Sequence, residues 1–141
     1  MLGPLKEREL LQEIRKAPVS LDALTFDECG EELAILQRGD ESGFGFGAGL
    51  WDRLKYQFRQ LICGQDPKDA DLRAQLQIAC KQGSGVLIAW LSATLGPKVG
   101  IEAAIAGPFV AILLLATARM GVRAICSDEP LNSVVEKVGD S

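Results

Sequence analysis

Few residues of this chain have the types and spacing that catalysis requires. The sequence holds no histidine, the usual proton shuttle near neutral pH. Four carboxylates stand where helices are expected to begin, and capping is a sufficient role for each: Asp27, Glu28, Asp66 and Asp69. The one candidate nucleophile is Cys63, which follows Arg59 by one helical turn. We therefore expect a protein that is not an enzyme and assign no catalytic residue.

The cysteines are the remaining residues with chemistry: Cys29, Cys63, Cys80 and Cys126. They form no C-x-x-C pair, and without histidine a zinc site would need all four thiolates or carboxylate help, so we expect no metal and no cofactor. The N-terminus lacks the basic-then-apolar layout of a signal peptide, which predicts a cytoplasmic chain with reduced thiols. A disulfide framework is disfavoured. We expect Cys63 and Cys126 to lie at the same end of a bundle as buried small hydrophobic residues.

Composition narrows the class of protein further. The net charge is −4 with a pI near 4.9, and no run of Lys and Arg is dense enough to follow a phosphate backbone, so nucleic acid is not an expected partner. The length of 141 residues suits a single domain that buries its own core. Hydrophobic residues make up 48% of the chain, which is ordinary, so the unusual feature is how they cluster.

That cluster is residues 86–118, in which only Lys98 and Glu102 carry charge. A helix that is apolar on all sides has no solvent face, so it lies in a protein core or in a bilayer. The pattern predicts a hydrophobic helical hairpin with arms 86–95 and 99–124. Pro108 lacks an N–H inside the second arm, which predicts a kink or two half-helices there.

Three amphipathic segments have apolar stripes that need a partner: residues 5–16, 50–63 and 67–82. Wrapping them around the hairpin predicts an all-α fold, a compact bundle of about five to six helices. Earlier in the chain, Thr25 and Glu28 have the spacing of a capping box. Residues 33–46 could form a small β-hairpin or the end of a helix.

We divide the single helical domain, 1–141, into four parts. Residues 1–49 hold the N-terminal helices and a glycine-rich connection, and residues 50–82 hold the amphipathic helices. The hydrophobic hairpin takes residues 83–126 and the tail 127–141.

The function we favour is a non-enzymatic, membrane-perturbing effector whose hairpin engages membrane lipid or oligomerises. It would be cytoplasmic, peripheral to the inner face of the membrane or inserted into it. Basic residues flank the hairpin on both sides, as in a segment inserted from the cytosol. The candidate membrane and tip residues are Trp90, Pro97, Lys98, Glu102, Phe109, Arg119 and Arg123.

Two alternatives remain open. In the first, the hairpin is ordinary core in a soluble interaction module, which binds a protein partner or a second copy through the Phe44/Phe46 segment or an amphipathic helix. The candidate partner-surface residues are Phe44, Phe46 and Trp51. In the second, the chain is a constitutive two-helix membrane protein, although the first arm is too short to span a bilayer of about 30 Å alone.

Overall fold

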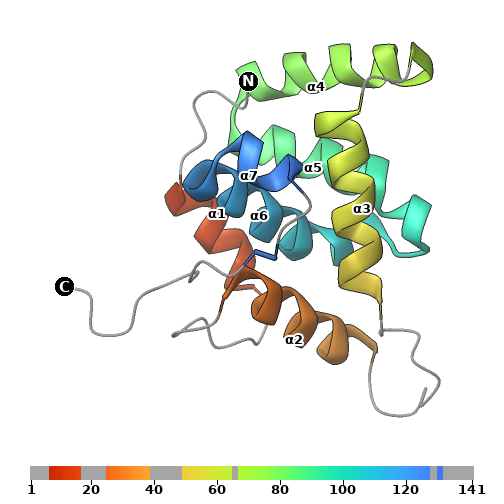
Figure 1. Cartoon of the computed structure of the whole chain (residues 1–141). Coiled ribbons are helices and arrows are strands. Elements are labelled where there is room, and N and C mark those ends of the chain that lie inside the picture. The colour runs from red at the N-terminus through yellow and green to blue at the C-terminus, as the bar shows by residue number, and fades with distance from the viewer. Residues whose placement is uncertain (1–6, 17–24, 39–48, 65–66, 128–129, 132–141) are drawn as a thin grey trace.

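The chain is a bundle of helices in the computed structural model, which describes residues 7–16, 25–38, 49–64, 67–127 and 130–131 (Figure 1). No β-strand lies within these ranges. The helices are, in order, α1 (Glu7–Ile14), α2 (Phe26–Arg38), α3 (Leu50–Cys63), the 3₁₀ turn η1 (Pro67–Asp69), α4 (Ala70–Gln82), α5 (Ser84–Leu95), the 3₁₀ turn η2 (Pro97–Val99), α6 (Ala103–Met120) and α7 (Val122–Cys126). The fold is all-α, as the sequence predicts.

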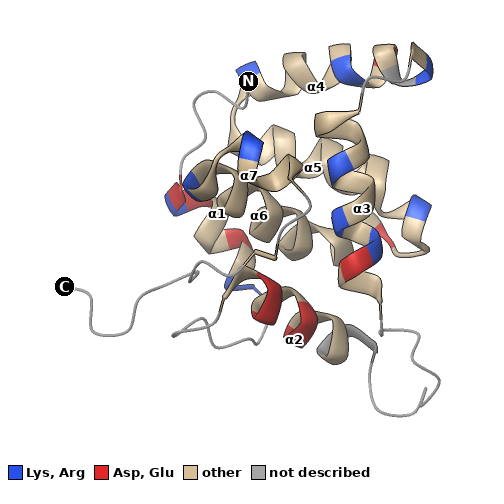
Figure 2. Ribbon diagram, viewed as in Figure 1, with Lys and Arg blue, Asp and Glu red and all other residues tan. Residues whose placement is uncertain are grey.

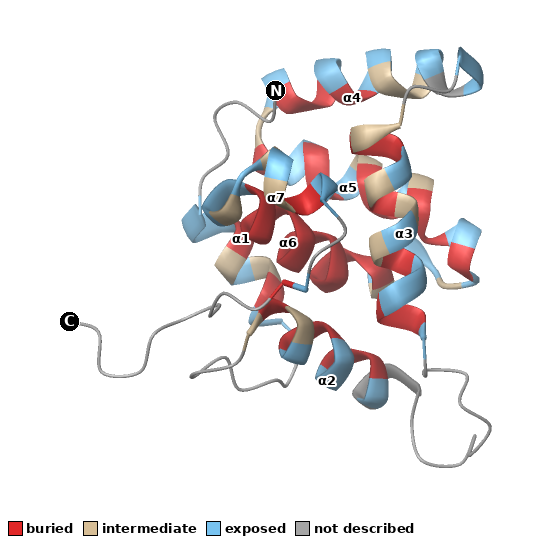
Figure 3. Ribbon diagram, viewed as in Figure 1, coloured by how far each residue is buried: buried red, intermediate tan, exposed pale blue. Residues whose placement is uncertain are grey.

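Helix α6 lies in the middle of the molecule. It packs against α1, α2, α3, α5 and α7, and its residues from 106 to 117 are all buried (Figure 3). A helix normally turns one face to water, but this stretch is apolar on every side apart from Thr117. Thr117 satisfies its own hydroxyl by donating to the Leu113 carbonyl at 2.8 Å. The helix is therefore the axis around which the bundle is built.

The surrounding helices are amphipathic and turn their apolar stripes inward. In α1, Leu10 and Ile14 are buried while most of the other positions are exposed. Helix α3 buries a longer stripe that includes Trp51, Leu54 and Phe58. The outer faces of these helices are largely exposed (Figure 3), so the surrounding helices shield α6 from water.

The structure differs from the sequence prediction at several points. Residues 33–38, expected either in a small β-hairpin or at the end of a helix, are the last residues of α2, while the rest of that predicted hairpin lies outside the described residues. At Pro108 the sequence predicts a kink or two half-helices, and the two half-helices are wrong because Pro108 lies inside the single helix α6. Pro108 is the sixth residue of α6, so its missing N–H removes a single backbone hydrogen bond near the start of the helix. The second arm ends earlier than expected, because Gly121 at φ 92° separates α6 from α7.

The α2–α3 crossing depends on the absence of a side chain at Gly30. A Cβ built at this position would overlap the indole ring of Trp51. We predict that Gly30→Ala lowers the free energy of unfolding by about 1 to 3 kcal/mol, because the indole must move out of a filled core. Urea denaturation followed by circular dichroism measures this loss. Gly85→Ala is the matched control, since a Cβ at that helical position meets nothing within 4 Å.

Candidate functional site

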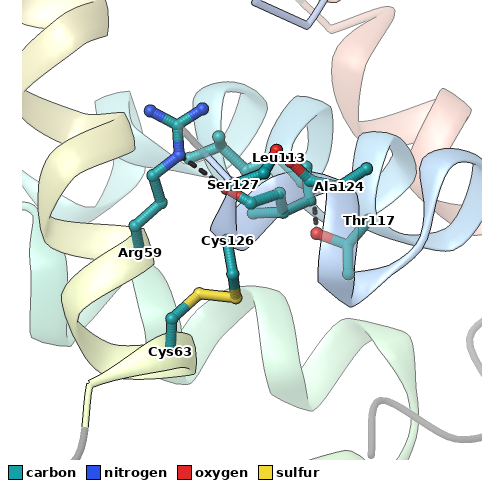
Figure 4. The surroundings of a disulfide bond; sticks show 8 residues. Arg59, Cys63, Leu113, Thr117, Ala124, Cys126 and Ser127 are labelled. Carbon is teal, nitrogen blue, oxygen red and sulfur yellow. Dashed lines mark hydrogen bonds between the residues drawn. A yellow bond between two sulfur atoms is a disulfide. The ribbon is translucent and has the colours of Figure 1, made fainter. Parts of the chain in front are cut away.

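A disulfide joins α3 and α7, two helices that both pack against the enclosed helix α6. Cys63 at the end of α3 is bonded to Cys126 at the end of α7, with their Cα atoms 5.8 Å apart (Figure 4). The expectation that disulfides are disfavoured is thus wrong for this pair, and both residues do lie at one end of the bundle. Neither is a buried hydrophobic residue, because Cys126 is exposed and Cys63 is partly exposed. The bond also excludes a four-thiolate metal site in this structure.

A hydrogen bond reinforces the disulfide. The Arg59 Nε donates to the carbonyl of Ile125 at 2.8 Å, one turn along α3 from Cys63 (Figure 4). Because α7 follows α6 after the single residue Gly121, both links hold the C-terminal end of α6 against α3. We call the Cys63–Cys126 bond with the Arg59–Ile125 hydrogen bond the clasp.

The two free cysteines, Cys29 and Cys80, are buried, and their thiols have low reactivity. Burial, with a contribution from the charge of Glu32, raises the pKa of the Cys29 thiol to about 12. Burial also raises the pKa of Cys80. A thiol with a raised pKa is rarely ionised, so neither is an effective nucleophile. Cys63, the candidate nucleophile, has no free thiol while the clasp is closed.

The turn between α5 and α6 presents the predicted tip to solvent. Pro97, Lys98 and Glu102 are all exposed, and no ion pair joins Lys98 to Glu102 in the described part of the chain. Val99 beside them is buried, and η2 packs against α3. The turn is therefore anchored by one apolar side chain while its charges face water.

The other candidate membrane residues are divided between core and surface. Phe109 is fully buried in α6, and Trp90 is half-buried with its indole N–H donating to Gln75 at 3.2 Å. Arg119 pairs with Glu7 at 3.3 Å, which links the end of α6 to α1. Arg123 is exposed on α7. These residues do not form one surface in the closed bundle.

Of the three residues predicted for a partner surface, the structure describes only Trp51. Trp51 is only 1% exposed, since it lies in the core between α2 and α3, so its assignment to a surface is wrong. Phe44 and Phe46 lie outside the described residues.

Asp27 links three parts of the chain, which the sequence did not indicate. The predicted capping box is present: Glu28 N–H donates to the Thr25 hydroxyl and Thr25 N–H to the Glu28 carboxylate. The Asp27 side chain instead accepts hydrogen bonds from outside α2, each at 2.8 Å, from Trp51 Nε1, Lys55 Nζ and Leu131 N. It therefore ties α2 to α3 and to the segment after α7.

The ionisation of Asp27 makes this link sensitive to acid. Burial raises the pKa of the carboxyl, but the hydrogen bonds from Lys55 and Trp51 outweigh burial and hold the pKa below its ordinary value of 3.8. A lowered folded-state pKa gives stability that is complete above pH 3.8 and is lost as the pH falls through the lowered value. We expect Asp27→Asn to cost about 1 to 3 kcal/mol at pH 7 and to flatten the fall in stability below about pH 4.

The matched control for Asp27 is Asp52→Asn. Asp52 approaches the same Lys55 at 3.5 Å, but its side chain is 76% exposed, so its loss is expected to cost less than about 0.5 kcal/mol. Urea denaturation of the three proteins between pH 3 and pH 7 measures both effects. Equal acid slopes for wild type and Asp27→Asn would contradict the role given to Asp27.

Charge is distributed unevenly over the helices that surround α6. Acidic residues gather on α2, whereas basic residues are spread over α3, α4 and α7 (Figure 2).

No family model matches this chain, and neither a curated protein nor a solved structure shows significant similarity to it.

Proposed function

We propose that the protein is a soluble store for a membrane-active helix: a small effector that keeps α6 enclosed and releases it into a lipid bilayer. The observation that carries the proposal is α6 itself. It is 18 residues long with a mean hydropathy of 1.8, and by length and composition it is the one helix within the described ranges that could cross a membrane. The amphipathic helices α1, α2 and α3 all pack against that helix.

The dimensions of α6 suit a bilayer. At about 1.5 Å per residue it is roughly 27 Å long, close to the hydrocarbon thickness of about 30 Å. Its single buried hydroxyl, on Thr117, is already bonded within the helix, so it would not enter lipid unsatisfied. Arg119 follows the apolar run, where its charge can reach the headgroups. The partner helix α5, with 12 residues or about 18 Å, does not span by itself, which disfavours a constitutive two-helix membrane protein.

Release requires the contacts around α6 to open. The clasp holds its C-terminal end through α7, and the Asp27 link holds α2 to α3 beside it. Reduction would break the disulfide, and acid would protonate Asp27. A disulfide forms and persists in oxidising surroundings, so we further propose that a reducing or acidic environment favours the open state.

Lys98 tests whether the turn enters the bilayer first. A charge near the bilayer centre costs several kcal/mol, whereas a lysine at the surface is attracted to anionic lipid by about 1 kcal/mol. We predict that Lys98→Glu weakens binding to anionic vesicles and lowers dye release, while Lys98→Leu increases insertion. Because Lys98 is exposed, either change is expected to alter the stability of the closed bundle by no more than about 0.5 kcal/mol.

The measurement is co-sedimentation with anionic vesicles and release of an entrapped dye, for wild type and both variants, with and without reductant. Circular dichroism confirms that each protein is folded beforehand. Identical curves for three folded proteins would rule out insertion with the turn leading. A wild type that neither binds nor releases dye at any pH would instead favour the soluble interaction module, in which α6 is ordinary core.

A further inference from the structure

A cavity of about 300 Å³ opens between α1, α5 and α6, away from the clasp. Small residues of α5 and α6 make much of its wall, among them Ala89, Ala104 and Gly107, and Ile88 adds a larger apolar surface. Two polar side chains also line it, Glu13 from α1 and Ser92 from α5. The volume is at the lower end of the range for small-molecule sites.

Ser92 is the first sign that the cavity is a binding site. The residue is only 3% exposed, yet its hydroxyl has no hydrogen-bond partner. A buried serine in a helix commonly donates to the carbonyl one turn before it, as Thr117 does in α6. Leaving a buried hydroxyl without a hydrogen bond destabilises the fold, so a group that binds it would recover that free energy.

Glu13 is the second sign. Its side chain is 19% exposed, and one carboxylate oxygen, Oε1, accepts from Lys16 Nζ at 2.9 Å. Lys16 itself is 69% exposed, so this ion pair is weak. The other oxygen, Oε2, lies against the backbone of Gly107, so close that a Cβ there would collide with it. The carboxylate is thus held at the cavity wall, and Lys16 binds only Oε1, so Oε2 has no hydrogen bond shown among the described residues.

Gly107 lets these groups come together. Ser92 Oγ lies 3.9 Å from the position that a Gly107 Cβ would occupy, on the same side as Glu13 Oε2. A side chain at residue 107 would fill this space. Because Gly107 has no side chain, the space stays open, and the Glu13 carboxylate, the Ser92 hydroxyl and the apolar wall all border the same cavity.

We propose that this cavity binds a small molecule with a primary ammonium group on a short aliphatic body. The ammonium offers three N–H donors, which match the free oxygen of Glu13 and the lone pairs of Ser92 Oγ. The aliphatic part packs on Ile88 and the neighbouring alanines. Binding at this cavity does not require α6 to insert into a membrane. The proposed binding site is therefore independent of the proposed membrane activity.

The test is isothermal titration of the full, folded protein with n-butylammonium, with n-butanol as the neutral probe of the same length. Wild type is expected to bind butylammonium one to one, and butanol at least about tenfold more weakly, since hydrogen bonds to charged groups are the stronger ones. Glu13→Gln keeps the shape of the side chain and is expected to weaken butylammonium binding by about tenfold or more. Ser92→Ala is expected to weaken it several-fold.

Two further variants separate binding from a loss of structure. Lys16→Gln removes the exposed competitor for Glu13 and is expected to tighten butylammonium binding, a gain that no damage to the fold would produce. Gly107→Ala fills the space and is expected to abolish binding, with thermal melting as the check on folding. Wild type that does not bind, butanol bound as tightly as butylammonium, or Lys16→Gln that binds more weakly than wild type would each overturn the proposal.

Discussion

Leu114→Ala is expected to lower the free energy of unfolding by about 2 to 5 kcal/mol, the range found when a large side chain is removed from a closed core. Leu114 lies on α6 with no exposed surface, and five other helices pack against α6: α1, α2, α3, α5 and α7. The surroundings cannot collapse onto the cavity from one free side, so most of its cost is retained. Reversible urea denaturation measures the loss.

Ile78→Ala is the matched control for Leu114→Ala. Ile78 is an aliphatic side chain on α4 that is 57% exposed, so its truncation is expected to stay within about 0.5 kcal/mol of wild type. A loss below about 1 kcal/mol for Leu114→Ala would mean that α6 is not enclosed in solution, and the proposal of a stored helix would lose its basis.

Opening the clasp is the second large effect. The disulfide closes a loop with a sequence separation of 63 residues, for which the chain-entropy model gives a stabilisation of about 4 kcal/mol. The double variant Cys63→Ser/Cys126→Ser is therefore expected to lose about 2 to 5 kcal/mol of stability. Denaturation under non-reducing conditions measures the difference from wild type.

Reductant provides the control for the clasp. Dithiothreitol is expected to bring wild type down to the stability of the double variant and to leave that variant unchanged, because Cys29 and Cys80 are already free thiols. An equal response of both proteins would assign the effect to something other than the Cys63–Cys126 bond.

Local patterns in the sequence were enough to place most of the helices. The spacing of Trp51, Leu54 and Phe58 predicted a helix over 50–63, which is where α3 begins and ends. The Thr25–Glu28 capping box is confirmed for the same reason, since both partners lie within one turn. The segment 33–38 was ambiguous because its short apolar run fits a strand as well as a helix, and packing of α2 against α3 and α6 favours the helix.

Contacts between distant residues were beyond the reach of these patterns. Cys63 and Cys126 showed no spacing motif, and their pairing depends on α7 turning back toward α3 after Gly121. Asp27 had a sufficient local role at a helix start, so nothing pointed to its bonds with Trp51 and Lys55. Nothing in the sequence placed the carboxylate of Glu13 beside Gly107, because the two residues are 94 positions apart.

The central claim, that α6 leaves the bundle for a bilayer, is tested most directly by photolabelling from within the membrane. Full-length protein is incubated with anionic vesicles that carry a photoactivatable group deep in the acyl chains, with the clasp closed or reduced, and the labelled peptides are mapped by mass spectrometry. We expect labelling within residues 103–120 after reduction, and little labelling of these residues while the disulfide is intact. Label confined to the exposed faces of other helices, or no label after reduction, would contradict it.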